Sequence, residues 1–302
     1  MSAIIIENLL SKYDLKKNYP AKELTNFHIG GACDYVVYPK SIQEIIDVIS
    51  VAKQNKVPVT IIGKGTNLLV SDKGIRGVVV RLEDNFSKIT MVDDNTIEAE
   101  AGASLKAVCD VSLQNSLTGV EFACGIPGGV GGAVAMNAGA YGPNMQDIVY
   151  EVTALDTDLN ILTFKNEEMD FSYRHSIVNE KNLIVLKVKF KLEKGDKRVI
   201  KETIDDLMFK RTSKQPLEAY SAGSTFKRPD GYFASKLIED SGLKGLVVGN
   251  VAVSGLHSGF LINTGSASCQ EVLDLIEFVK QVVGNKFGVT LEEEVKIIGD
   301  FS

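Results

Sequence analysis

The sequence contains no tryptophan, only four cysteines and three histidines, and no excess of positive charge. Its formal net charge of -6 argues against a nucleic-acid surface, because such a surface needs a basic stripe or domain to neutralise phosphates. The cysteines are scattered without Cys-x-x-Cys spacing, and the histidines show no metal-ligand spacing. We therefore expect buried free thiols and no bound metal.

Long apolar runs are also absent. No run reaches the roughly 18 residues that a membrane-spanning helix requires, and the N-terminal segment lacks the charged start and apolar core of a signal peptide. We therefore expect a cytoplasmic protein with no membrane insertion. The 302 residues, 44% of them hydrophobic, are enough for two or three packed units.

The N-terminal part of the chain alternates helix and strand. Ser41 and Glu44 have the spacing of a capping box, and isoleucines then recur at helical spacing up to Asn55. Residues 57–62 follow as a short strand. This pattern predicts a first unit that covers residues 1–81.

The middle of the chain is rich in strands, and it predicts a second unit over residues 82–192. Val188, Phe190 and Leu192 alternate with lysines, which is typical of an antiparallel or mixed sheet with one packed face. The charged segment 193–198 is the best linker candidate. A third unit, 193–302, is predicted to contain a helix that begins at Ser268 and a closing strand over 289–298.

Two segments are unusually rich in glycine. The first, Gly63 to Leu68, follows a strand, but it has neither a third glycine at position 68 nor room for a helix after it, so it is not a Rossmann or Walker loop. A simple turn and a phosphate cradle are equally compatible with its spacing. The second, Gly125 to Gly142, holds seven glycines. Ordering each glycine costs conformational entropy, so this many favour a segment whose backbone closely approaches a flat or phosphorylated ligand over a plain loop.

A third segment places a hydroxyl between a flexible glycine and two cations. Gly223 and Ser224 precede Lys227 and Arg228, an arrangement that suits proton delivery beside a bound anion. Taken alone, a Gly-Ser pair is more often part of a turn. Further cations lie at Lys210 to Lys214, and such runs are commonly solvated surface.

Several ordered motifs together resemble the UDP-N-acetylenolpyruvoylglucosamine reductase family along nearly the whole chain. Besides the three segments above, the resemblance rests on the motifs Thr25 to Gly31, Phe171 to Ser176 and Leu291 to Val295. The chain is similar to the shorter, type II form, because residues 179–181 pass directly into the next strand without a tyrosine-bearing insertion. Arg228 departs from the asparagine of some members, which leaves the contact at that position open.

The resemblance implies an α+β fold, in which two FAD-binding subdomains of the vanillyl-alcohol-oxidase (PCMH) type, 1–81 and 82–192, are joined to a C-terminal substrate-binding domain, 193–302. It implies non-covalent FAD, because the first loop has no histidine to tether the flavin. The expected partners are NADPH and UDP-N-acetylglucosamine enolpyruvate, bound by a monomer. The FAD-binding residues that it implies are Gly63, Lys64, Gly65, Thr66, Asn67, Gly125, Pro127, Gly128, Gly131, Gly132 and Asn137.

The implied reaction has two halves. NADPH reduces FAD, and flavin N5 then passes hydride to the enolpyruvyl alkene of the substrate. The resemblance assigns the proton to Ser224, the stabilisation of negative charge to Arg174, and a further stabilising role to Glu294, which we expect to enter protonated. Substrate contacts are expected from Tyr141, Tyr173, Lys210, Arg211, Lys227 and Asn263.

Two other functions remain open. A flavin-dependent alcohol or sugar oxidase of the same fold would share the glycine segments but would not need Arg174, Ser224 and Glu294 together. A non-catalytic module that senses a nucleotide sugar would bind no flavin, so the purified protein would be colourless.

Overall fold

The computed structural model describes residues 2–302, with side chains described from Ile6 onward. The chain divides into two compact units, each assembled from separate stretches. Unit 1 comprises the stretch ending at Leu15, Val37–Lys64 and Val79–Arg211, and unit 2 comprises Lys16–Val36, Gly65–Val78 and Thr212–Ser302. Both units mix helices and strands, as the predicted α+β class requires. Among residues 2–302, no helix is both long enough and apolar enough to cross a membrane.

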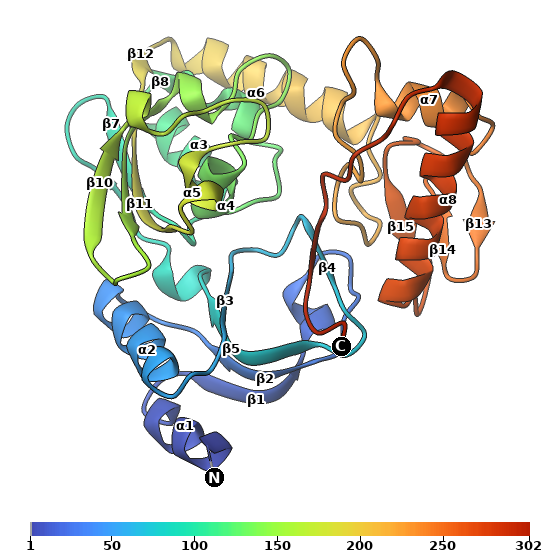
Figure 1. Cartoon of the computed structure of the whole chain (residues 1–302). Helices are drawn as coiled ribbons and strands as arrows, with labels where there is room; N and C mark the ends of the chain where they lie inside the picture. Colours follow the sequence, from blue (N-terminus) through green and yellow to red (C-terminus); the bar gives the residue numbers. More distant parts are fainter. Residues whose placement is uncertain (1) are drawn as a thin grey trace. The chain divides into compact units, whose positions relative to one another are not determined.

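Unit 1 is built around an antiparallel sheet (Figure 1). Its helices are α1 (Ser2–Leu10), α2 (Ile42–Gln54), α3 (Leu105–Gln114), α4 (Val130–Ala135), α5 (Ile177–Glu180) and most of α6 (Lys197–Thr212). Its strands are β3 (Val59–Ile62), β6 (Ile89–Met91), β7 (Thr96–Glu100), β8 (Leu117–Thr118), β9 (Val149–Leu155), β10 (Ile161–Lys165), β11 (Ile184–Lys191) and β12 (Glu193–Lys194).

The sheet has the strand order β10-β9-β11-β7-β6, and every neighbouring pair in it is antiparallel. Val188 and Phe190 of β11 are fully buried, whereas Lys187 and Lys189 pair with Glu98 and Glu151 at 2.9 and 2.7 Å. The predicted alternation of a packed face and a wet face is confirmed. Helices α3 and α4 pack against this sheet.

Helix α2 begins and ends where the sequence predicts. The Ser41 hydroxyl accepts a hydrogen bond from the Glu44 N–H at 3.2 Å, and the helix is capped at Asn55. The capping box is incomplete, because the Glu44 carboxylate accepts instead from the N–H of Lys40, one residue before the cap, at 2.8 Å.

The linker predicted over residues 193–198 is wrong. Strand β12 pairs with β8, the Gly195 N–H donates to the Ser116 carbonyl at 2.9 Å, and α6 starts at Lys197. The charges of this segment lie on a paired strand and a helix start rather than on a free connection.

Unit 2 contains two sheets of its own and part of a third. Its elements are β1 (Leu15–Pro20), β2 (Ala32–Val37), β4 (Leu68–Val70), β5 (Ile75–Arg81), α7 (Ala234–Asp240), β13 (Val247–Val248), β14 (Val251–Val253), β15 (Leu261–Asn263), α8 (Cys269–Phe287) and β16 (Lys296–Ile298). Strands β13-β14-β15 form an antiparallel sheet, and β16 pairs in parallel with β4. A four-stranded sheet has the order β1-β2-β5-β3, and β5 passes from unit 2 into unit 1 after Val78.

Helix α8 (Figure 1) supplies much of the core of unit 2, including Val272, Ile276 and Val279. The helix starts after Ser268, as the sequence predicts, and Ser268 and Glu271 form a complete capping box there. It ends at Gly288, whose φ of 68° favours glycine. The strand predicted over 289–298 is wrong for its first part, because regular pairing covers only Lys296–Ile298. Leu291 and Val295 are nevertheless buried in the core, which fixes the segment between them.

Candidate active site

The first glycine segment begins directly after β3. A side chain at Gly63 would meet no atom within 4 Å, so this position faces open space. Gly65 differs, because it has a φ of +67° and a Cβ there would collide with the carbonyl oxygen of Leu24. The chain then enters β4 without a helix, as the sequence predicts. Gly65 is thus required by packing, whereas Gly63 leaves room for a ligand.

Asn67, at the end of this segment, supports the backbone of Glu294. Its side-chain amide donates to the Glu294 carbonyl at 3.1 Å, and its own carbonyl accepts from the Lys296 N–H at 3.0 Å. Both bonds lie within unit 2. The structure therefore links one expected FAD-binding residue with one expected catalytic residue.

The second glycine segment is partly helical, since α4 occupies its centre. The N–H groups of Val130 and Gly131 donate to the carbonyls of Ala103 and Ala101, each at 2.9 Å, and a Cβ on Gly131 would lie 2.9 Å from that of Ala101. Close packing after β7 therefore explains Gly131. A side chain at Gly132, in contrast, would meet nothing within 4 Å.

The two glycine segments approach each other inside unit 1. A Cβ on Gly129 would lie 3.6 Å from the Cγ of Lys64. The Lys64 ammonium forms an ion pair with Asp84 at 3.0 Å. Gly128 is another residue expected to bind FAD. Its carbonyl accepts a hydrogen bond from the Leu105 N–H at 3.1 Å, so it fixes the start of α3.

Asn137 connects the second glycine segment to the Tyr-Arg motif. Its amide donates to the Ser172 carbonyl at 3.0 Å, and its side-chain oxygen accepts from the Gln146 N–H at 3.0 Å. Because Asn137 is buried and bonded at both ends, its side chain positions the turn that follows Ser172.

Tyr173 and Arg174 form the tip of that turn. Ser172 and His175 bond to each other in both directions, at 3.1 and 3.2 Å, so only two residues separate them. Arg174 has a φ of +57°, and its guanidinium lies 5.1 Å from the centre of the Tyr173 ring. The turn presents both side chains together, with Tyr173 exposed.

Arg211 is a half-buried cation with an unsatisfied donor. Among the described residues its Nε is one of the few buried side-chain atoms without a hydrogen-bond partner. Burial lowers the pKa of this guanidinium, and Tyr141 opposes that shift. A Cβ on Gly125 would lie 2.7 Å from the Arg211 Cδ, so the side chain lies against the start of the second glycine segment. Lys210 instead pairs with Asp206 at 2.6 Å along α6.

Ser224 and Glu294 lie on neighbouring segments of unit 2. The Glu294 N–H donates to the Thr225 carbonyl at 2.8 Å, and the Lys227 N–H donates to the Glu292 carbonyl at 2.8 Å. On the other side, the Thr225 N–H donates to the Gly259 carbonyl at 2.8 Å. Ser224 and Glu294 are both half-buried, and a short ladder of backbone bonds fixes them.

The other expected substrate residues of unit 2 have partners of their own. Lys227 pairs with Glu292 at 3.0 Å. Asn263 is buried, and its amide donates to the carbonyls of Phe27 and His28 at 3.1 and 3.4 Å, while its oxygen accepts from two N–H groups before α8. Arg228, which the sequence leaves undecided, lies 4.0 Å from the Phe233 ring centre. The three expected catalytic residues are divided between the units, with Arg174 in unit 1 and Ser224 and Glu294 in unit 2.

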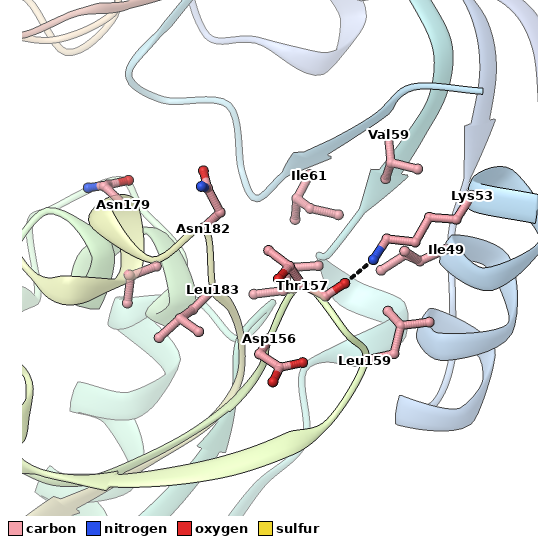
Figure 2. A pocket seen from close by; sticks show the side chains of 12 residues that line it. Ile49, Lys53, Val59, Ile61, Asp156, Thr157, Leu159, Asn179, Asn182 and Leu183 are labelled. Atoms are coloured by element: carbon pink, nitrogen blue, oxygen red, sulfur yellow. Dashed lines mark hydrogen bonds between the residues drawn. The ribbon is translucent and has the colours of Figure 1, made fainter. Parts of the chain in front are cut away.

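A cavity of about 430 Å³ in unit 1 has no counterpart in the sequence analysis (Figure 2). It is lined by Ile49, Lys53, Val59, Ile61, Asp156, Thr157, Leu159, Val178, Asn179, Asn182, Leu183 and Ile184. Two of these lining residues contact each other, because the Lys53 ammonium donates a hydrogen bond to the Thr157 carbonyl. Because the lining comes from four separate elements and two connections, no local pattern signals this cavity.

The turn region also groups Asp170, His175 and Glu180, whose potential ligand atoms lie within 4.8 Å of one another. The imidazole Nε2 lies 3.4 Å from the Asp170 carboxylate. The three residues stand five apart in the sequence, and the fold of the chain between them brings their side chains together. Both acids are exposed, and exposed acidic groups of this kind are common without a metal.

Comparison with known proteins finds family models that match two stretches of the chain. Residues 33–165 match the model of the FAD binding domain, and residues 215–298 match that of the UDP-N-acetylenolpyruvoylglucosamine reductase C-terminal domain. A reductase of that name from Caldanaerobacter subterraneus subsp. tengcongensis is 51% identical, over 99% of this chain and 100% of its own length. One from Clostridium novyi is 50% identical, over 98% of this chain and 96% of its own length.

A solved structure supports the same assignment. The UDP-N-acetylenolpyruvylglucosamine reductase of Thermus caldophilus is 30% identical and superposes with a TM-score of 0.79, covering 94% of this chain and 98% of its own. The FAD-binding unit joined to the family's C-terminal domain confirms the predicted fold class. The chain belongs to the UDP-N-acetylenolpyruvoylglucosamine reductase family of FAD-dependent oxidoreductases.

Proposed function

We propose that this chain reduces UDP-N-acetylglucosamine enolpyruvate to UDP-N-acetylmuramate, a peptidoglycan precursor, with NADPH as the electron donor and non-covalent FAD as the carrier. The observation that carries the proposal is the 51% identity, across 99% of the chain, to a relative named as this reductase.

The two glycine segments fit a bound FAD. Gly63 and Gly132 face open space, as close approach of a pyrophosphate or a flat ring requires. Gly65, Gly131 and Asn137 would act by shaping the two segments. The remaining residues proposed to hold FAD are Lys64, Thr66, Asn67, Pro127 and Gly128.

FAD, when bound, supplies hydride transfer from NADPH to the enolpyruvyl alkene. The alkene is conjugated to a carboxylate, so negative charge develops on the carboxylate oxygens as its terminal carbon is reduced. We assign Arg174 to that charge, because a guanidinium stays ionised and can grip a carboxylate through two hydrogen bonds. Tyr173, at the same turn, would position the substrate beside it.

Ser224 would deliver the proton to the carbon next to the carboxylate. A hydroxyl is a weak acid, but a carbanion-like intermediate is a far stronger base, so the transfer runs downhill. The backbone ladder through Thr225 supports this role, because it holds the Ser224 segment on both sides. Such preorganisation keeps a donor near the acceptor without further reordering.

Glu294 would assist from the neighbouring segment. A carboxylate would oppose the developing negative charge, so we propose that Glu294 acts in its protonated form and donates a hydrogen bond. Its backbone is tied on both sides, by the N–H bond to Thr225 and by the carbonyl bond from Asn67. The side chain is half-buried, which allows a partly desolvated carboxyl.

Phosphate groups of the sugar nucleotide need cations. Arg211, with Tyr141 nearby, has an unsatisfied donor and is the strongest candidate. Lys210 and Lys227 would first have to leave Asp206 and Glu292, and Asn263 would act by holding the segment at Phe27 and His28.

The test follows NADPH absorbance with the purified holoenzyme, with and without UDP-N-acetylglucosamine enolpyruvate. We expect a yellow protein and NADPH loss that depends on the sugar nucleotide. Steady oxygen consumption with a simple sugar would instead identify an oxidase. A colourless protein that binds the nucleotide sugar without consuming NADPH would identify a sensing module. Either result overturns the proposal.

A further inference from the structure

His257 is a half-buried histidine to which the proposed function assigns no role. It lies in the loop that joins β14 to β15, and this loop closes where the Ser254 N–H donates to the Phe260 carbonyl at 2.9 Å. Within the loop, the Ser254 hydroxyl accepts from the N–H groups of Leu256 and His257 at 3.2 and 3.3 Å. The Phe260 N–H donates to the His257 carbonyl at 3.0 Å. These bonds fix the backbone on both sides of the histidine.

The imidazole of His257 binds the backbone of Gly259. The Gly259 N–H donates to the imidazole Nδ1 at 3.1 Å, so this nitrogen carries no proton and the neutral ring is protonated at Nε2. A Cβ on Gly259 would lie 3.0 and 3.1 Å from the Cε1 and Nδ1 atoms of the ring, and 3.3 Å from the Ser235 Cβ of α7. The ring therefore lies directly against Gly259, and the missing side chain permits this contact.

Gly259 connects this imidazole with the segment that holds Ser224. The Gly259 carbonyl accepts from the Thr225 N–H at 2.8 Å, and this N–H belongs to the peptide group that joins Ser224 to Thr225. Ser224 itself lies opposite Phe260 as its antiparallel bridge partner. Glycine has more backbone freedom than any other residue, so a bond to its N–H restricts the rotation that would turn its carbonyl away. Two hydrogen bonds in series thus connect the imidazole with the Ser224 peptide group.

We propose that His257 is a positioning residue for Ser224: its neutral imidazole holds Gly259, and Gly259 holds the peptide group that follows the serine. The inference rests on the proposed function, in which Ser224 delivers the proton. In this role His257 exchanges no proton with the substrate. It acts on the distance between the Ser224 hydroxyl and the carbon that is protonated, so it affects reoxidation of the flavin by substrate and leaves reduction of the flavin by NADPH unchanged.

The surroundings of the imidazole favour its neutral form. Burial lowers the pKa of His257 below the ordinary value of a histidine, a backbone hydrogen bond opposes this shift, and Lys244 adds to it. Glu239 of α7 raises the pKa, and it forms an ion pair with Lys244 at 2.9 Å, so the two charges partly cancel. A protonated Nδ1 cannot accept from the Gly259 N–H. The hydrogen bond is therefore present above the pKa of His257 and is lost as the pH falls through it.

Two variants at position 257 of the full-length holoenzyme test this role by stopped-flow absorbance of the flavin. His257→Leu removes the acceptor, so reoxidation by UDP-N-acetylglucosamine enolpyruvate should slow about tenfold, the order expected for one lost hydrogen bond. His257→Asn offers an amide oxygen near the position of Nδ1 and should recover most of the rate. Added to Ser224→Ala, His257→Leu should have no further effect, because the group that it positions is absent. Reduction by NADPH should keep the wild-type rate in both position-257 variants.

The pH profile separates this role from simple packing. Reoxidation in wild type should slow as the pH falls through the pKa of His257, which lies below the usual value of about 6.5 and can be measured by NMR titration of the imidazole. His257→Asn should lose this dependence, because an amide does not titrate. His28→Asn is the matched control, since it removes another half-buried histidine of unit 2 and should keep the dependence.

Amide hydrogen exchange measures the same contact without turnover. The Thr225 N–H should exchange on the order of tenfold faster in His257→Leu than in wild type, because Gly259 no longer holds its carbonyl in place. The Lys227 N–H is the internal control. It lies two residues further along the same segment and donates to the Glu292 carbonyl, away from the loop of His257, so its exchange should stay unchanged.

Three results would overturn the proposal. One is unchanged exchange of the Thr225 N–H in His257→Leu, and another is an equal loss of reoxidation rate from His257→Leu with and without Ser224. The third is a reoxidation rate in wild type that does not follow the titration of His257, and this measurement stands even if a variant fails to fold. Reoxidation of Ser224→Ala at the wild-type rate would instead contradict the proposed function, so the two failures can be told apart.

Discussion

The two units hold their proposed functional residues in different ways. In unit 1, Arg174 lies at the tip of a two-residue turn with a φ of +57°, and Gly63 and Gly132 face open space. In unit 2, Ser224 and Glu294 lie on extended segments that the backbone bonds of Thr225 connect. Unit 1 thus offers room for a ligand, whereas unit 2 offers a fixed pair of polar groups. We infer that changes at Gly63 and Gly132 act on cofactor binding, and that changes at Ser224 and Glu294 act on the step after flavin reduction.

The largest expected effect in unit 2, apart from loss of Ser224, comes from Glu294. We expect Glu294→Ala to slow turnover by on the order of 10² to 10⁴, the usual loss for a positioned proton-bearing group. Glu294→Gln keeps a hydrogen-bond donor and should retain appreciable activity. Steady-state kinetics of the two variants, with flavin content as a control, check this expectation. Equal inactivity of Gln and Ala would remove the proton-bearing role.

The variants Gly65→Ala and Gly63→Ala compare a glycine that packing requires with a glycine that leaves room for a ligand. At Gly65 the left-handed backbone and the Leu24 carbonyl both oppose a side chain, so alanine should lower the free energy of unfolding by about 1–3 kcal/mol or more. At Gly63 alanine should change it by less than about 0.5 kcal/mol, yet weaken FAD binding by on the order of tenfold. Denaturant unfolding and flavin titration measure the two quantities. Similar effects on stability at both positions would break the contrast.

Asn67→Ala tests the link between the first glycine segment and Glu294. The variant loses the donor to the Glu294 carbonyl, so we expect the free energy of unfolding to fall by about 1 kcal/mol. Reoxidation of the flavin by substrate should also slow, because Glu294 loses one of its two backbone supports. Denaturant titration and stopped-flow kinetics measure both effects. Unchanged reoxidation would show that the Thr225 bond alone is sufficient.

The smallest effect concerns the ion pair of Glu293 with Lys280, at 2.9 Å. Burial, the largest single cause, raises the pKa of Glu293. The hydrogen bond and charge of Lys280, a backbone hydrogen bond and the charge of Lys227 together outweigh it, so the net shift is downward. A depressed pKa stabilises the fold above the unfolded value, near pH 4.3, and the contribution is lost as pH falls through the folded value. Lys280→Met should therefore cost about 0.5 kcal/mol at neutral pH, discounted for exposure, and nearly nothing well below pH 4.

Lys201→Met, which breaks an exposed pair with Asp205 on α6, is the control for that effect. Both variants are followed by thermal unfolding across the acidic range. A loss for Lys280→Met that grows as the pH falls would have the wrong sign for a depressed Glu293 pKa.

Local signals in the sequence predicted those elements that local bonds stabilise. Ser41 and Ser268 marked the starts of α2 and α8, because their hydroxyls cap free N–H groups. The alternation in β11 predicted its packed face, because burial repeats every second residue in a strand. The ordered motifs predicted the family and the fold class through resemblance.

Elements that depend on distant contacts could not be predicted in this way. Helix α4 contains two glycines, which disfavour helix, and it forms where N–H groups bond to Ala101 and Ala103. The segment 289–295 has the composition of a strand, but it gains only isolated pairing next to residues 225–227.

Flavin reoxidation in Ser224→Ala tests the central claim most directly. Stopped-flow absorbance would follow the flavin first with NADPH and then with UDP-N-acetylglucosamine enolpyruvate. We predict that NADPH still bleaches the flavin at the wild-type rate, while reoxidation by the sugar nucleotide slows by on the order of 10² to 10⁴. Reoxidation at the wild-type rate would contradict the account, because Ser224 could not then be the proton donor.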